Sequence, residues 1–238
     1  MNIEDENNID KQLQNLMAEI KSATVTLELN LFGKTQISQV LTLNHSGLAK
    51  DIYNMTSVYK KQLMIVNESH ALWQASLQKD LMDKMDLFEQ HIQICYEFAT
   101  IVKALFFFVR AYQDQLYRFI LNQNSEKDRL SMTSASNPKN PVRIWVDKKA
   151  PGYYEWFENF TKCRDKLKKG KSHGVTFKEE GIYIDIFCVQ FNESPSPNKA
   201  IPEYSISINY IVSSIQWTLV VIAKLNEEFK PLPLISRA

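Results

Sequence analysis

The chain has 238 residues, and its 28 Lys and Arg residues nearly balance 27 Asp and Glu residues, so the formal net charge is +1. Apolar residues make up 45% and charged residues 23%, which is typical of a globular protein and excludes a broadly disordered chain. A near-neutral total also excludes a uniformly basic nucleic-acid binder. Any contact with a polyanion therefore has to come from a local basic segment.

The cysteines and the apolar runs indicate where the protein works. Cys95, Cys163 and Cys188 lie far apart and form no CxxC pair, which excludes a disulfide framework and a cysteine zinc site. Free thiols are typical of a reducing compartment. The start, MNIEDENNIDKQL, is too polar for a signal peptide. The most apolar run, residues 101–109, contains Lys103 and is too short to span a bilayer. We therefore predict a cytoplasmic protein with no membrane contact, no metal and no cofactor.

The sequence before residue 48 predicts one short helix and two strands. Apolar residues at helical spacing predict a short amphipathic helix over residues 9–20. Strict apolar–polar alternation predicts a strand over residues 25–31. Phe32-Gly33-Lys34 can turn the chain, so residues 36–43 are predicted to return as a second strand of a hairpin.

Two long helices are predicted next. From Leu48 to Leu77 and again from Leu81 to Ile120, apolar residues recur mostly at steps of three and four, as on one face of a helix. A break is expected near residues 78–80. The second helix has two adjacent apolar stripes, which indicates a central position. At about 1.5 Å per residue each helix is roughly 45–60 Å long, as in an antiparallel helical bundle.

The second half of the chain is predicted to complete that bundle. Residues 122–140 are polar and low in bulk, so we expect a flexible connector inside a single domain that covers residues 1–238. Further helices are expected over residues 153–168 and 210–228. Two strands are expected between them, in GIYIDIFCVQF and YSISIN, and a C-terminal tail over residues 231–238. The predicted fold is mainly α: an antiparallel helical bundle with a small antiparallel β-sheet, formed by the N-terminal hairpin and the C-terminal strands.

The most informative stretch runs from aromatic residues into a basic segment. Six of the ten residues from Lys162 to Lys171 are Lys or Arg, with one acid, Asp165. One interpretation is a solvated helix end, where cations meet the negative end of the helix dipole. The other is phosphate contact, in which Arg164 binds a phosphate in bidentate fashion and His173 moves a proton near neutral pH. The lysines that would hold a nucleic-acid backbone are Lys166, Lys168, Lys169 and Lys171.

Other motifs carry less information. Gly170-Lys171-Ser172 has Asp165 where a phosphate-binding loop needs its first glycine. His70 and His91 have no acidic neighbours at ligand spacing, so we interpret them as core-edge or surface residues. The aromatic residues that precede the basic segment could stack bases, but their helical spacing favours the core. These residues are Tyr153, Tyr154 and Trp156.

The string GYYEWFENFTKCRDKLKKGKSHGV resembles the last core helices of the HEPN superfamily of helical-bundle domains from prokaryotic toxin–antitoxin and defence systems. The resemblance implies an RNA-binding homodimer that is a metal-independent endoribonuclease. Arg164 and Asp165 match the family's arginine and its polar neighbour, and His173 would match its histidine. Eight residues intervene, which would put the two side chains on nearly opposite faces of a continuous helix. The pair therefore requires a helix break at Gly170.

A second hypothesis needs no catalysis. The bundle could pair with another protein chain, and the basic segment could dock an acidic partner or only keep the protein soluble. The sequence leaves both hypotheses open.

Overall fold

The computed structural model describes residues 11–22, 36–78, 81–121, 131–170, 172–187 and 204–228. The chain divides into two compact units. Unit 1 consists of Met1–Leu13, Met55–Phe106 and Lys162–Val212, and unit 2 consists of Gln14–Asn54, Phe107–Thr161 and Ser213–Ala238. The single domain expected from the sequence stays a prediction.

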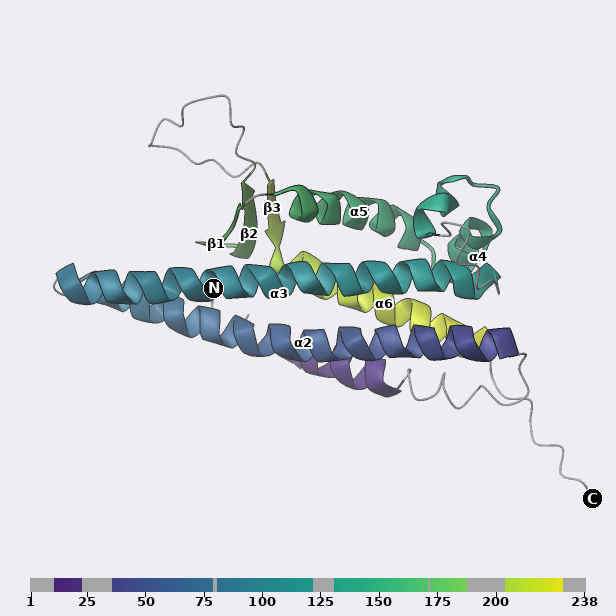
Figure 1. Ribbon diagram of the computed structural model, residues 1–238, viewed down its shortest axis with the longest axis horizontal. Helices are drawn as coiled ribbons and strands as arrows, with labels where there is room; N and C mark the ends of the chain where they lie inside the picture. Colours follow the sequence, from purple (N-terminus) through teal and green to yellow (C-terminus); the bar gives the residue numbers. More distant parts are fainter. Residues whose placement is uncertain are drawn as a thin grey trace, which may run out of the picture. The chain divides into compact units, whose positions relative to one another are not determined.

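The fold is mainly helical with a small three-stranded antiparallel sheet, as predicted (Figure 1). Residues 11–22 are helical and bury Leu13, Leu16 and Ile20. The long helices are confirmed, including the break after residue 76. The helices after residue 35 are α2 (Gln36–Ser76), α3 (Leu81–Leu121), η1 (Met132–Ser136), α4 (Pro141–Lys149), α5 (Tyr153–Lys169) and α6 (Ile208–Glu228).

The predicted N-terminal hairpin is wrong in its second strand. Residues 36–43 are the first turns of α2, whereas the first predicted strand, residues 25–31, lies outside the described residues. Ile37, Val40 and Leu41 fit a helical spacing at least as well as an alternating one. Helix propagation adds one hydrogen bond for each residue fixed, so a long helix that is already nucleated readily extends over such an ambiguous segment.

The sheet belongs to unit 1 and is made of strands that follow α5. Its strands are β1 (Ser172–Lys178), β2 (Gly181–Phe187) and β3 (Tyr204–Ser207), with β2 in the middle (Figure 1). Both pairings are antiparallel. The predictions of β2 and β3 are confirmed, and β1 is an additional strand. Among the described residues the sheet contains no N-terminal strand, so that part of the predicted fold is corrected.

The central strand of this sheet buries an acid. Asp185 is 4% exposed, and its carboxylate accepts hydrogen bonds from the hydroxyls of Thr176 on β1 and Ser205 on β3. A buried carboxylate is costly unless it is hydrogen-bonded, so these two hydroxyls make the position tenable. Asp185 thereby pins both neighbouring strands in register.

In unit 2, part of the predicted connector is folded. Residues 131–140 contain η1, which buries Met132 and Ala135. The Met132 amide donates to the Asp114 carboxylate on α3 at 3.0 Å. Asn140 then caps α4 by accepting from the Val142 amide, with Pro141 at the first helical position. Residues 122–130 lie outside the described residues.

The aromatic first half of α5 packs inside unit 2. Tyr153, Trp156 and Phe160 are at most 7% exposed. The ring of Trp156 lies 5.2 Å from those of Tyr153 and Phe160 and 6.1 Å from that of Trp217 on α6. These residues are core, as their spacing favoured, and are not a base-stacking surface.

Candidate functional site

The basic end of α5 carries the residues that the sequence predicted as a site. The helix ends at Lys169, and the Gly170 amide donates to the Lys166 carbonyl at 2.8 Å. A side chain at Gly170 would overlap Ile186 Cγ2 on β2, so only glycine lets the chain pass this close to the sheet. The helix break that the Arg164–His173 pair requires is therefore present.

The cations of this segment differ in exposure. Lys162, Lys168 and Lys169 are exposed, while Arg164 and Lys166 are half-buried. Lys166, Lys168 and Lys169 occupy the last turn of α5, where they meet the negative end of the helix dipole. Lys171 lies outside the described residues. The position of the lysines therefore fits both interpretations of the segment, a helix end and a phosphate contact.

Arg164 already has an anionic partner. Its Nε donates to Asp165 Oδ1 at 3.1 Å, and its Nη2 makes a second, shorter contact with the same oxygen. The Arg164 side chain is 21% exposed and that of Asp165 is 45% exposed, so water partly screens this pair and its contribution to stability is small. A phosphate can compete with Asp165 for the guanidinium.

His173 is fixed by the last turn of α5. It lies on β1, half-buried, and its Nε2 is 3.2 Å from the Leu167 carbonyl oxygen. A carbonyl can only accept, so Nε2 carries the proton and Nδ1 of the neutral ring keeps its lone pair. Burial lowers the pKa of His173, and the positive charge of Lys103 lowers it further. The hydrogen bond to the Leu167 carbonyl raises the pKa, but its effect is smaller than that of burial. The ring is therefore neutral at pH 7 and can accept a proton.

Arg164 and His173 lie on successive elements and bind different partners. Within the part of the chain that the structure describes, no hydrogen bond joins them: Arg164 pairs with Asp165, and His173 pairs with Leu167. Leu167 is one helical turn after Arg164, so both residues are anchored to the last two turns of α5. The structure thus places the two predicted residues at the same helix end, with no hydrogen bond between them among the described residues.

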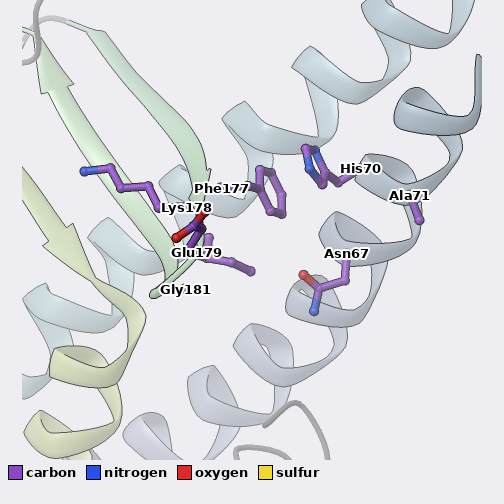
Figure 2. Close-up of a pocket in the computed structure, with 8 residues that line it drawn as sticks. Asn67, His70, Ala71, Phe177, Lys178, Glu179 and Gly181 are labelled. Carbon is purple, nitrogen blue, oxygen red and sulfur yellow. The ribbon is translucent and has the colours of Figure 1, made fainter. Parts of the chain in front are cut away.

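Sequence reasoning missed a second cluster in unit 1, around His70 and His91. The His70 ring on α2 stacks on Phe177 of β1, with centroids 3.6 Å apart and planes 5° apart, as Figure 2 shows. The His91 ring on α3 lies 5.4 Å from that of His70. The signal available beforehand was weak, because Phe177 lies in a strand that the sequence analysis did not predict.

His91 is held by a serine on α2. Its Nδ1 lies 2.9 Å from Ser69 Oγ, and the same hydroxyl lies 3.0 Å from the Val66 carbonyl oxygen. Burial lowers the pKa of both imidazoles, and for His70 the charge of His91 adds to the effect. Both rings are therefore neutral near pH 7, which allows them to pack together without charge repulsion.

A pocket of about 400 Å³ adjoins this cluster. Its lining includes Asn67, His70 and Ala71 from α2 and Phe177, Glu179 and Gly181 from the β1–β2 hairpin (Figure 2). The described residues contain no group of three or more His, Cys, Asp and Glu side chains arranged to hold a metal ion. The pocket therefore offers hydrogen bonding and ring stacking, and nothing in it defines a reaction.

The buried cysteines are poor nucleophiles. Burial raises the pKa of Cys95 to about 11. Burial also raises the pKa of Cys163, whose Sγ lies 3.1 Å from the Tyr204 hydroxyl. A thiol that stays protonated at neutral pH does not attack a substrate. Cys188 lies outside the described residues.

Two described helical stretches, Lys84–Leu121 and Ile208–Leu225, are long and apolar enough to cross a membrane by length and composition. The core helix of a soluble protein passes the same test. The absence of membrane contact and the cytoplasmic location therefore stay predictions.

Comparisons of the chain with protein-family models, with curated proteins and with solved structures found no match.

Proposed function

We propose that this protein binds single-stranded RNA through the basic end of α5 and cleaves it without a metal ion, as the HEPN resemblance implies. One observation carries the proposal. The last turn of α5 carries Lys166, Lys168 and Lys169, and the Leu167 carbonyl in the same turns accepts from Nε2–H of His173, which leaves the Nδ1 lone pair of the neutral ring as the proton acceptor.

Electrostatics support a local site. The chain as a whole carries +1, so long-range attraction of RNA to the entire protein is weak. Lys162, Lys168 and Lys169 concentrate exposed positive charge on about two turns of one helix. Such a patch releases counterions when it binds a phosphate backbone, so its affinity falls as salt rises.

The proposed chemistry is transesterification within the RNA. Nδ1 of His173 takes the proton of a ribose 2′-hydroxyl, and the 2′-oxygen forms a bond to the adjacent phosphorus. The bond from phosphorus to the 5′-oxygen breaks, and that oxygen takes a proton from water. The products are a 2′,3′-cyclic phosphate and a 5′-hydroxyl. Arg164 stabilises the negative charge that develops on the phosphate oxygens.

Binding is tested by fluorescence anisotropy with a labelled single-stranded RNA at about 150 mM salt. Lys168→Glu/Lys169→Glu should weaken binding by roughly tenfold or more and flatten the salt dependence. The matched control is Lys148→Glu/Lys149→Glu, which reverses two adjacent lysines in the last turn of α4. Equal losses in both variants would mean that binding follows net charge, and would overturn the proposed site.

Cleavage is tested separately, in the presence of EDTA. His173→Gln keeps a side-chain N–H for the Leu167 carbonyl but removes the base, so it should abolish cleavage while the melting temperature holds. Arg164→Ala should reduce cleavage through loss of phosphate stabilisation, with little change in stability because water partly screens its pair with Asp165. A His173→Gln protein that cleaves at the wild-type rate would remove His173 from the mechanism.

A second candidate function, a non-catalytic interaction protein, is favoured by exposed apolar side chains. Met85, Phe88, Ile92 and Tyr96 lie along α3 and are 52%, 45%, 38% and 49% exposed. Apolar side chains grouped in this way often mark a protein–protein contact. This candidate requires purified protein that neither binds nor cleaves RNA in the two assays above.

A further inference from the structure

An apolar stripe follows the outer side of α2 in unit 1. Val58, Ile65 and Leu72 are 43%, 42% and 60% exposed, and Met64 beside them is 54% exposed. Val58, Ile65 and Leu72 are seven residues apart, so they lie nearly in line along the helix. The stripe extends over about 21 Å. Large apolar side chains in such a row are costly to leave in water, which indicates a partner.

Two opposite charges interrupt the stripe at matching positions. Lys61 lies between Val58 and Ile65, and Glu68 lies between Ile65 and Leu72, and both are exposed. Across the described residues neither forms an ion pair. The order along the stripe is therefore apolar, basic, apolar, acidic, apolar.

This order is complementary to itself when reversed. An antiparallel second helix centred on Ile65 brings Val58 opposite Leu72 and brings Lys61 close to Glu68. A two-fold axis at Ile65 repeats each of these contacts twice, as an isologous interface requires. An unrelated partner would place no such constraint on the two charges.

Lipid is a poorer occupant of this stripe. Lys61 and Glu68 lie in the middle of it, and charged side chains are expensive inside a bilayer. Neither described helical stretch with the length and apolar composition of a membrane span is part of α2.

We propose that the Val58–Leu72 face of α2 binds the same face of a second copy of this chain, antiparallel, with Ile65 on the two-fold axis. The stripe is small compared with a standard protein–protein interface, so we expect a dissociation constant on the order of micromolar to tens of micromolar. The proposal is independent of RNA binding, because none of its residues lies on α5 or the sheet.

The first test is sedimentation equilibrium of the full chain over a range of concentrations. Ile65→Asp places two carboxylates opposite each other at the axis, and should raise the dissociation constant by roughly tenfold or more. Ile144→Asp is the matched control: the same substitution at an isoleucine of α4 that is 56% exposed. The control should dimerise as the wild type does. Monomeric wild type at every concentration would overturn the proposal.

The second test uses the self-complementary charges. Lys61→Glu gives a chain with two acids on the stripe, and Glu68→Lys gives a chain with two bases. Each variant alone should dimerise about fivefold more weakly, because both symmetry-related contacts become repulsive. An equimolar mixture should form a heterodimer, since each acid then faces a base.

The equimolar mixture of Lys61→Glu and Glu68→Lys distinguishes the α2 interface from a dimer that forms through another surface. A dimer that forms through any other surface leaves both variants unchanged and gains nothing on mixing. That result would overturn the α2 interface even though the protein dimerises. RNA binding by the same variants, measured as described above, should be unchanged, so failure here and failure of the proposed function remain distinguishable.

Discussion

The arginine–aspartate pairs Arg110–Asp114 in unit 2 and Arg164–Asp165 in unit 1 differ in their burial and in the elements that they join. In unit 2, Arg110 is 8% exposed; its Nη2 lies 3.0 Å from Asp114 and 2.8 Å from the Thr133 hydroxyl, and its guanidinium lies 5.0 Å from the centre of the Phe157 ring. In unit 1, the ion pair of Arg164 is with its neighbour in sequence, Asp165, and both side chains are more exposed than that of Arg110. The buried pair ties η1 to α3, whereas the partly exposed pair joins two residues of the same helix.

The comparison shows that burial decides what a charge can do. Removing one partner of a buried pair leaves the other charge without compensation, so such a pair resists change. A surface pair is cheap to break, so its arginine can exchange a carboxylate for a phosphate. A candidate binding arginine should therefore be sought among the weakly held ones.

The largest expected effect would come from Arg110. Arg110→Met should lower the free energy of unfolding by about 2–3 kcal/mol, because Asp114 loses its charge partner and η1 loses an anchor; the value is at the low end since Asp114 is partly exposed. Arg164→Met should change it by less than about 1 kcal/mol. Urea unfolding measures both. Equal losses would show that Arg164 is also a structural residue.

The next largest effect is an opposite change in stability when Gly170 and Gly47 are each replaced by alanine. Gly170→Ala would overlap Ile186 Cγ2, and relieving that overlap should cost about 1–3 kcal/mol. Gly47→Ala, inside α2 in unit 2, meets no atom within 4 Å and should stabilise the protein by about 0.5–1 kcal/mol through helix propensity. Thermal unfolding of both variants tests the pair. A neutral Gly170→Ala would mean that the α5–β1 junction is loose, and would weaken the case for a fixed His173.

The smallest expected effect is a dependence of folding stability on pH that arises from histidines of unit 1. His70, His91 and His173 all lie there, and burial lowers the pKa of each below 6.5. Below pH 6.5 the unfolded chain binds more protons at these residues than the folded chain, so stability falls as the pH drops from 6.5 toward the lowered values. Above pH 6.5 this contribution is fully present. Melting temperatures measured across this window should decrease toward acid.

A variant without one titrating ring sharpens that result. His70→Phe keeps a ring to stack on Phe177 but cannot be protonated, so its melting temperature should depend less on pH below 6.5. Hydrogen exchange at acidic pH should increase first in the segments of unit 1. Increased exchange confined to unit 2 would contradict the assignment.

Periodicity was enough to predict the helices but not every strand. The spacing of Leu81 through Ile120 predicted α3 almost to its ends, because a long repeat averages over local ambiguity. The short segment at residues 36–43 was mistaken for a strand, because its few apolar residues fit two periods. Strand β1 was missed, although Val175 and Phe177 alternate with Gly174 and Thr176. A strand of seven residues gives a weak signal when one glycine, Gly170, lies just before it and another, Gly174, lies inside it.

The candidate site was predicted in its residues but not in its contacts. The basic run of α5 and the requirement for a break at Gly170 were visible beforehand. The partners were not, because the Leu167 carbonyl that orients His173 and the ring that stacks on His70 depend on how strands pack against helices. The tautomer of His173 follows only from its contact with that carbonyl.

The order of side chains along the chain determined the long helices, the aromatic core of α5 and the position of its cations. Each of these follows from the helical spacing of three and four residues, which places particular side chains on one face of a helix. Packing alone decided which histidines become buried and neutral, which arginine is held fast, and that Asp185 is tolerated at the centre of the sheet. Those outcomes depend on how much water each polar side chain loses on folding and on which groups replace that water. The replacing groups come from segments far apart in the sequence, so the order of residues alone does not give them.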